Sequence, residues 1–202
     1  MNKKPFWNYL ANNYDKNAKG TMDFYNTIAY KISESLDKNS TVLEIATGTG
    51  ILAEKIAPYC KAIEAIDFSE KMIEQALRKN MPDNIRFSIQ DANTLRFPSN
   101  SFDAVIILDA LHVIPNTANV LKNIRKVLKP EGVLIATTIV KGTSGDNIVM
   151  RAAMKLLNFT LWNYDEYLNL FTDNGWEIIN STYLAENTST AYVVTKPRII
   201  SQ

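Results

Sequence analysis

The sequence predicts an α/β fold: a doubly wound, seven-stranded sheet that is mostly parallel, with an antiparallel last strand and helices on both faces. Three observations predict it. Short apolar segments alternate with helical segments between residues 41 and 138, a pattern typical of right-handed crossovers in a parallel sheet. The first apolar segment runs directly into a glycine turn. Two strand-like segments close the chain, as expected for a hairpin at a sheet edge.

Local patterns predict each element in order. Apolar residues at helical spacing over 6–14 and a helical segment at about 22–36 precede the first strand. We expect strands at 41–46, 62–67, 85–90, 104–108 and 133–138, and helices at 50–57 and after Ser69, a typical N-cap residue. A turn at 129–132, which contains proline and glycine, precedes the fifth strand. The chain ends with a loop at 141–146, an apolar segment at 148–162, a helix at 165–174 and strands at 176–184 and 191–195, joined by a polar loop at 186–190.

The most informative segment is 41–50, where an apolar strand leads through Gly48 and Gly50 into a helix. The two glycines allow a sharp turn and the close approach of a ligand to the backbone, and the helix directs its amide donors at that ligand. Asp67 ends the next strand, where a carboxylate can accept hydrogen bonds from both ribose hydroxyls. Together these residues indicate a nucleotide-cofactor site. A tight strand-to-helix connection followed by a solvated acid is the alternative.

Composition excludes several classes of function. Lysine and arginine number 22 against 21 acidic residues, so the net charge of +1 provides no overall attraction for nucleic acid, and none is expected as a partner. Cys60 is the single cysteine and His112 the single histidine, which excludes an internal disulfide and a zinc cluster of such residues. No apolar run is long enough to span a membrane. We therefore expect a cytoplasmic protein without membrane contact, and a homodimer is compatible with the sequence.

The order of elements, together with Leu-Glu-Ile-Ala-Thr-Gly-Thr-Gly at 43–50, resembles the class I S-adenosylmethionine-dependent methyltransferases over roughly residues 5–196. Further matches are Asp67, Asp91 with Ala92, the fourth strand at 102–109 and the segment 128–134. The resemblance implies a single Rossmann-like domain over 1–202. Its parts would be an N-terminal helical cap (1–38), a cofactor-binding core (41–138), an insertion or lid (141–163), and a C-terminal helix with a β-hairpin (164–196). S-adenosyl-L-methionine would be the cofactor.

The resemblance also implies a role for each matched residue. Glu44 would support the methionine amino end of the cofactor, and Asp67 would bind the ribose hydroxyls. Asp91 would accept a hydrogen bond from the adenine amino group, and the backbone of Ala92 would contact the ring edge. The other implied cofactor-binding residues lie in the glycine turn, after the second and fourth strands and in the N-terminal cap: Ala46, Thr47, Gly48, Gly50, Phe68, Met72, Leu108 and Tyr14.

Two of these positions have particular features. Ala46 stands where the commonest family pattern has its first glycine, and we expect a tolerated alanine whose φ stays below zero. Tyr14, followed by Asp15, resembles the Tyr-Asp pair of small-molecule members, in which the tyrosine folds over the cofactor. Plain helix packing is an equal alternative for Tyr14. The pair and the turn are similar to those of the ubiquinone and menaquinone C-methyltransferase group.

Methyl transfer needs an aligned nucleophile and exclusion of water, and a general base only where the nucleophile carries a proton. Asp109 and His112 follow the fourth strand and are the candidate catalytic residues, since histidine titrates near neutrality. His112 could instead hold the loop, and Asp109 could cap the next helix. No metal is expected, because Thr137 and Thr138 stand where the metal-dependent O-methyltransferases have an Asp-Asn pair after the fifth strand.

We expect a small, apolar or aromatic acceptor, because apolar residues gather in the first helix and the insertion: Phe6, Trp7, Leu10, Met150, Met154, Phe159 and Trp162. Packing against the sheet is the alternative for each of them. Two other functions compete. An NAD(P)-dependent oxidoreductase fits the glycine turn and Asp67, but does not account for Glu44 or Asp91. A non-catalytic cofactor-binding scaffold would keep the same fold.

Overall fold

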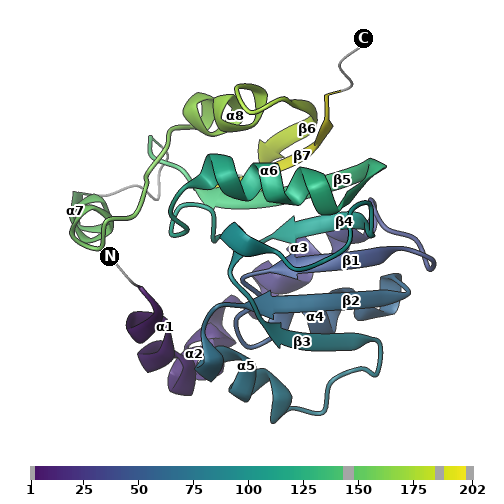
Figure 1. Ribbon diagram of the computed structural model, residues 1–202. Helices are drawn as coiled ribbons and strands as arrows, with labels where there is room; N and C mark the ends of the chain where they lie inside the picture. The colour runs from purple at the N-terminus through teal and green to yellow at the C-terminus, as the bar shows by residue number, and fades with distance from the viewer. Residues whose placement is uncertain (1–2, 143–147, 185–188, 199–202) are drawn as a thin grey trace.

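The computed structural model describes residues 3–142, 148–184 and 189–198. Within these residues the strands form one seven-stranded sheet of order β3-β2-β1-β4-β5-β7-β6 (Figure 1). The strands are β1 (Thr41–Ile45), β2 (Ala62–Asp67), β3 (Ile85–Ile89), β4 (Phe102–Ile107), β5 (Leu128–Ile139), β6 (Trp176–Tyr183) and β7 (Thr190–Pro197). β7 is antiparallel to both β5 and β6, and lies between them. The predicted fold class is thus confirmed, including the antiparallel last strand and the closing hairpin.

The register of the parallel strands brings their carboxyl ends to one edge. Ile45, the last residue of β1, pairs with Ile66 of β2 on one side and with Ile107 of β4 on the other. Asp67 in turn pairs with Ile89 at the end of β3. In doubly wound sheets ligands bind at this edge, where the strand order reverses between β1 and β4. The segments that leave β1, β2, β3 and β4 therefore meet in one place.

Helices cover both faces of the sheet. The α-helices are α1 (Lys4–Leu10), α2 (Tyr14–Ala18), α3 (Met22–Ser33), α4 (Ile51–Ile56), α5 (Glu70–Leu77), α6 (Thr117–Val127), α7 (Ile148–Leu156) and α8 (Tyr164–Thr172). Short 3-10 helices are η1 (Ala11–Asn13), η2 (Lys19–Thr21), η3 (Ala57–Tyr59) and η4 (Ala92–Thr94). Figure 1 shows α1, α2 and α7 beside the carboxyl edge of the sheet. None of the helices in the described ranges combines the length and apolar character that a membrane span requires.

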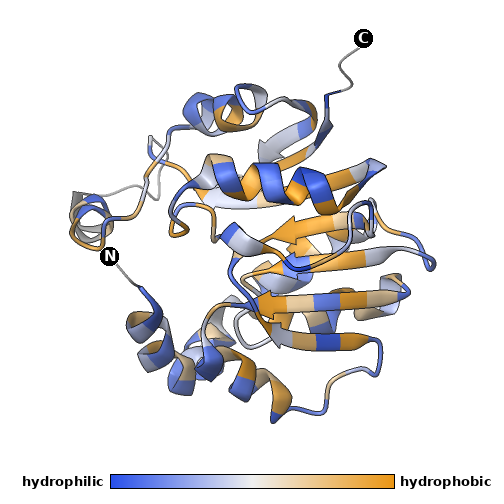
Figure 2. Cartoon of the chain, viewed as in Figure 1, coloured by the Kyte–Doolittle hydropathy of each residue, from blue (hydrophilic) through white to orange (hydrophobic). Residues whose placement is uncertain are grey.

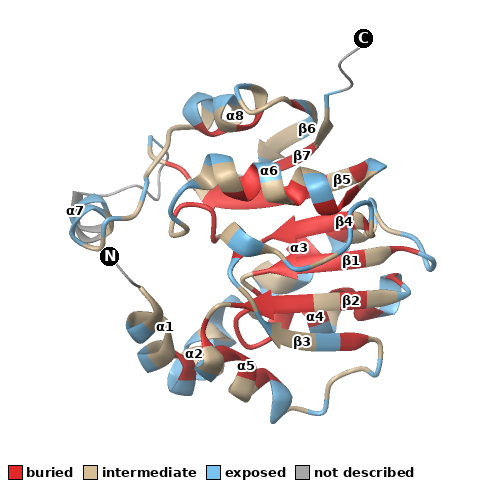
Figure 3. Ribbon diagram, in the orientation of Figure 1, coloured by how far each residue is buried: buried red, intermediate tan, exposed pale blue. Residues whose placement is uncertain are grey.

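Two apolar layers hold these helices to the sheet. Ile28 and Ile32 of α3 pack with α4 against one face, and Ile124 of α6 packs with Tyr167 and Phe171 of α8 against the other. The central strands are apolar and buried, whereas α6 alternates between polar and apolar residues along its length (Figures 2 and 3). Strands covered on both faces become nearly continuous apolar runs, which is why β1 and β4 could be predicted from sequence.

Ser69 caps α5, as predicted: its hydroxyl accepts a hydrogen bond from the amide of Met72.

The turn predicted at 129–132 is wrong, because β5 already begins at Leu128 and remains extended through Pro130 and Gly132. The β4–β5 register shifts between Phe102 and Ala104, and a local irregularity of this kind tolerates a proline within a strand. Part of the predicted loop at 141–146 and most of the polar loop at 186–190 lie outside the described residues.

Candidate functional site

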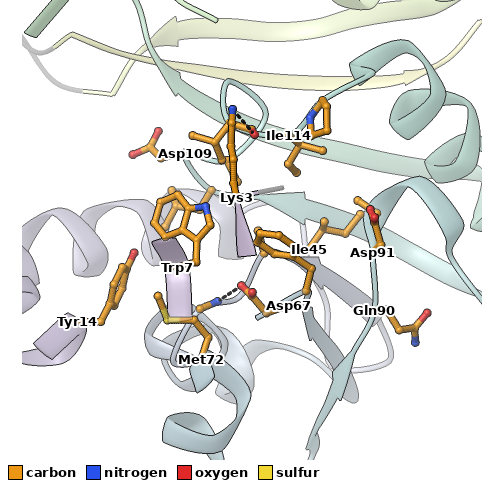
Figure 4. Close-up of a pocket in the computed structure, with 18 residues that line it drawn as sticks. Lys3, Trp7, Tyr14, Ile45, Asp67, Met72, Gln90, Asp91, Asp109 and Ile114 are labelled. Atoms are coloured by element: carbon orange, nitrogen blue, oxygen red, sulfur yellow. Dashed lines mark hydrogen bonds between the residues drawn. The ribbon is translucent and has the colours of Figure 1, made fainter. Parts of the chain in front are cut away.

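A cavity of about 280 Å³ lies at the carboxyl edge of the sheet. Its walls come from α1, from the segments that follow β1, β2, β3 and β4, and from α5 (Figure 4). The lining residues are Lys3, Trp7, Tyr14, Ile45, Ala46, Gly48, Asp67, Phe68, Met72, Gln90, Asp91, Ala92, Leu108, Asp109, Ala110, Val113, Ile114 and Pro115. This volume is near the lower end of the range for small-molecule sites.

The turn after β1 is left-handed at three positions. Ala46 has φ +58°, Gly48 φ +58° and Gly50 φ +80°. The expectation that Ala46 keeps φ below zero is therefore wrong. The amide of Thr47 donates to the carbonyl of Ile66 (3.0 Å), which ties the turn to β2 while the chain leaves the sheet, and Ala46 takes the strained conformation just before that contact.

The two glycines serve different purposes. Gly48 lines the cavity, and a Cβ there would face the ring of Tyr14 at 3.7 Å. Gly50 is absent from the cavity lining and begins α4; a Cβ there would lie 2.7 Å from Cζ of Phe87. Gly48 thus keeps space for a ligand, whereas Gly50 allows the turn to pack against β3.

Asp67 is buried at the end of β2 and presents its carboxylate to the cavity. One oxygen accepts a hydrogen bond from the amide of Gly48 (3.0 Å) and the other from the amide of Ser69 (2.8 Å). Burial raises the pKa of this carboxyl group, and the backbone hydrogen bonds oppose the rise. Because a carboxylate offers about four acceptor positions, Asp67 retains capacity for two further donors.

Glu44 and Thr47 carry polar atoms that lack partners within the described part of the protein. Oε2 of Glu44 and Oγ1 of Thr47 are buried without a hydrogen bond. Burial, followed by the charge of Asp67, raises the pKa of Glu44 to about 8. Neither residue belongs to the cavity lining. The neighbouring hydroxyl of Thr47 opposes this rise in the pKa of Glu44.

Asp109 sits directly beyond β4 in an unusual conformation, with φ +45°. Oγ1 of Thr137 accepts a hydrogen bond from the Asp109 amide (3.0 Å) and donates one to its carboxylate (2.8 Å). Burial raises the pKa of Asp109 to about 6. Thr137, on the neighbouring strand β5, therefore holds the carboxylate in place at the cavity wall. From the sequence, Thr137 was expected only to stand in the place of an absent metal ligand.

His112 lies beside this wall and is absent from the lining. Its Nδ1 is 3.1 Å from Oγ1 of Thr138, its ring meets that of Phe159 edge to face, and its carbonyl accepts from the amide of Thr160. Burial, followed by the positive charge of Lys3, lowers the pKa of His112 to about 4. The contacts join the loop after β4 to the segment after α7.

Comparison with known proteins identifies the domain. Residues 43–136 match the family model described as a methyltransferase domain. Just under half of the chain is thus similar to methyltransferase domains. The resemblance to the class I S-adenosylmethionine-dependent methyltransferases is thereby confirmed. The rival assignment to the NAD(P)-dependent oxidoreductases has no support from these matches.

Relatives with the same printed name match about half of this chain. The ubiquinone/menaquinone biosynthesis C-methyltransferase UbiE of Rickettsia bellii is 35% identical over 107 residues, which are 48% of this chain and 43% of that protein. The match thus spans less than half the length of the relative. UbiE of Rickettsia massiliae is 32% identical over 117 residues, 53% of this chain and 47% of that protein.

Solved structures agree on the fold. A chain of the Haloferax volcanii complex containing the Trm112 methyltransferase activator has a TM-score of 0.80 at 18% identity, covering 96% of this chain and 98% of its own. The DhpI complex with SAH has a TM-score of 0.78 at 19% identity, covering 98% and 96%. The cyclase SpnF has a TM-score of 0.74 at 18% identity, covering 87% and 81%. At these identities the likeness concerns the fold alone.

The remaining residues predicted for the methyltransferase site are arranged as follows. Phe68, Met72, Ala92 and Leu108 line the cavity. Asp91 lines it too, although one carboxylate oxygen accepts from the amide of Asn93 (2.8 Å) and caps η4. Most of the predicted set, from four strand ends far apart in sequence, therefore surrounds one space.

The N-terminal cap also reaches this space. Tyr14 lines the cavity, and burial raises the pKa of its hydroxyl. Trp7 lines it as well, whereas Phe6 packs against Phe159 with ring centroids 6.4 Å apart. Leu10, Met154 and Trp162 are not in the lining, and the side chain of Met150 lies outside the described part. Lys3 and Ile114 contribute walls that no local sequence pattern indicated.

Proposed function

We propose that this chain transfers a methyl group from S-adenosylmethionine to a small, apolar or aromatic acceptor without using a metal ion. The observation that supports it best is the position of Asp67, whose carboxylate faces the cavity beside Gly48. Two of its acceptor positions remain for a pair of vicinal hydroxyls, such as those of ribose. A cytoplasmic location remains a prediction.

The residues present fit the cofactor. Gly48 lacks a Cβ where the chain borders the cavity, and Oε2 of the buried Glu44 has no hydrogen-bond partner among the described residues. We infer that Asp67 binds the ribose, that Glu44 supports the methionine amino group, and that Phe68 and Met72 contact the adenine. Held by these residues, S-adenosylmethionine would supply an electrophilic methyl carbon to the acceptor's electron pair, and S-adenosylhomocysteine would be the leaving group.

Asp109 suits the role of proton acceptor better than His112. Its carboxylate lines the cavity, is oriented by Thr137, and has a pKa raised to about 6, so it is ionised near neutral pH. His112 is turned to Thr138 and Phe159, outside the lining. We infer that His112 holds the loop after β4, and that Asp109 takes a proton where the acceptor carries one.

Apolar walls favour an apolar or aromatic acceptor. Trp7, Val113 and Ile114 line the side of the cavity formed by the N-terminal helix and the loop after β4. Aromatic and aliphatic side chains of this kind exclude water from the reacting groups, which favours displacement at an activated carbon. Two of the similar proteins are named as C-methyltransferases of ubiquinone and menaquinone biosynthesis, and we propose an aromatic acceptor here as well.

Calorimetric titration with S-adenosylhomocysteine, with NADH and NADPH as controls, tests the proposal. We expect micromolar binding of S-adenosylhomocysteine alone. Asp67→Ala should weaken it by about 100-fold, because two charge-assisted hydrogen bonds are lost. Lys71→Ala, on the exposed face of α5 where Lys71 pairs with Glu74, is the matched control and should bind as the wild type does. Binding of a dinucleotide alone, or unchanged affinity in Asp67→Ala, would refute the proposal.

A further inference from the structure

Lys3 places a positive charge at the cavity. Its ammonium group donates to the carbonyl of Val113 (3.1 Å) and to the carbonyl of Asn158 (2.8 Å), and lies 4.4 Å from the ring centroid of Phe159. Figure 4 shows the side chain extending across the wall near Ile114 and Trp7, with the contact to Val113 drawn as a dashed line. Lys3 thus belongs to the same side of the cavity as the apolar walls.

Charged side chains of both signs line the cavity. Three carboxylates, those of Asp67, Asp91 and Asp109, line it from the ends of β2, β3 and β4. Lys3 is the one cationic side chain in the lining that the structure describes. Its neighbour Lys4 pairs with Glu70, whereas no acidic side chain among the described residues forms an ion pair with Lys3. The positive charge of Lys3 is therefore not neutralised by an ion pair within the described part of the protein.

Lys3 retains the capacity to bind a further group. An ammonium group has three N–H donors, and the two carbonyls use two of them. Carbonyl oxygens hold the group in position but leave its charge uncompensated. An oxyanion placed at the third donor would form a charge-assisted hydrogen bond in a partly water-excluded site, where such bonds are stronger than neutral ones.

We propose that Lys3 binds an oxyanion of the methyl acceptor, so that the acceptor is an aromatic or apolar molecule that carries a carboxylate or a similar anionic group. This inference rests on the proposed function, since it assigns the Lys3 side of the cavity to the acceptor. The ring of the acceptor would lie against Trp7 and Ile114, and its anionic group would point to Lys3. Recognition then combines apolar contact with one charge.

A purely mechanical role for Lys3 makes a different prediction. Its hydrogen bonds join the N-terminus to residues 110 and 155 positions away, so Lys3 could act only as a clasp that holds α1 over the cavity. Loss of a clasp would weaken every ligand alike. Loss of an anion site would weaken anionic ligands selectively, which separates the two roles.

The test compares 2-naphthoate with 2-naphthamide, which share a ring system and differ in charge. Both are titrated into the protein with saturating S-adenosylhomocysteine, and again without it. We expect wild type to bind the naphthoate about tenfold more tightly than the amide, the fold-change of one moderate charge-assisted hydrogen bond. Lys3→Met should remove the preference, and Lys3→Arg should keep it.

Lys4→Met is the matched control, because Lys4 is a neighbouring cation outside the cavity lining, and the preference should persist in it. The inference would be overturned if wild type bound both probes equally or bound neither. It would also be overturned if the preference for the naphthoate survived Lys3→Met, or if Lys3→Met weakened the binding of both probes equally. Failure of wild type to bind S-adenosylhomocysteine would instead overturn the proposed function, and the titrations without it would still test Lys3.

Discussion

Two single residues at the carboxyl edge of the sheet have a strained backbone conformation. Ala46 and Asp109 follow the neighbouring strands β1 and β4, and both have positive φ, +58° and +45°. A left-handed conformation costs an L-residue about 1–2 kcal/mol, and such strain persists where the surrounding structure imposes it. Both residues also line the cavity, so the strained positions coincide with the proposed ligand site.

The strain at Ala46 can be measured. Ala46→Gly should stabilise the protein by about 0.5–1 kcal/mol, because relief of about 1–2 kcal/mol of strain exceeds the backbone entropy cost of a glycine. Thermal unfolding would report a raised Tm. Ala53→Gly, within α4 and fully buried, is the control and should destabilise by about 1 kcal/mol or more. Equal destabilisation by the two substitutions would contradict the left-handed backbone at Ala46.

Glu44 should make stability depend on pH. Its pKa is about 8 in the folded chain, above its ordinary value of 4.5, so the folded state holds the proton more tightly. Stability from this group is complete below about pH 4.5 and is lost as pH rises through about 8. Asp109, with a pKa of about 6, and His112, whose pKa is lowered to about 4, change the stability of the fold mainly below pH 6.5. Of these three groups, Glu44 therefore contributes most to the pH dependence of stability between about pH 6.5 and about pH 8.5.

Without ligand, the Tm of wild type should fall across this interval, and Glu44→Gln should reduce the fall. Thermal melts at several pH values provide the comparison. Glu74→Gln, at a surface position paired with Lys71, is the control and should retain the wild-type slope. A wild-type Tm that stays level, or a slope unchanged in Glu44→Gln, would show that Glu44 is not a buried acid of raised pKa.

At the level of elements, the β1–α4 connection depends on Gly50. Its φ is +80°, and a Cβ would lie 2.7 Å from Cζ and 2.8 Å from Cε1 of Phe87 on β3. Gly50→Ala should lower the free energy of unfolding by about 2–4 kcal/mol, combining left-handed strain with overpacking. Chemical denaturation would measure it.

Gly20→Ala is the matched control for Gly50→Ala, since a Cβ at Gly20 would meet no described heavy atom within 4 Å beyond its chain neighbours. It should change stability by less than about 1 kcal/mol. A loss at Gly50 no larger than the change at Gly20 would mean that Phe87 moves aside freely, and that the turn does not require glycine there.

The arrangement of the strands explains which site residues could be predicted from the sequence. Strand ends are local features, so the positions of Gly48, Asp67 and Asp91 at one edge followed from their places after apolar runs in a parallel sheet. The clamp of Thr137 on Asp109 depends on the register of β4 with β5, which pairs Ile107 with Ala136 and has no local signal. The left-handed Ala46 was missed because alanine seldom adopts that conformation.

At the level of the whole molecule, the sheet order brings distant segments to one cavity. The contacts of Lys3 across 110 and 155 residues arise from tertiary packing and could not be read from sequence. The methyltransferase domain and the fold could be predicted because both depend on the order of strands and turns along the chain. The division of the chain into cap, core, insertion and terminal hairpin remains a prediction.

We propose that the cavity at the carboxyl edge of the sheet binds S-adenosylmethionine through Asp67. A crystal structure of the protein with S-adenosylhomocysteine tests it most directly. We predict that the adenosyl group occupies the cavity, with both ribose hydroxyls within about 3.2 Å of the Asp67 carboxylate oxygens. Density for the ligand elsewhere, or a ribose without contact to Asp67, would contradict the assignment of this site.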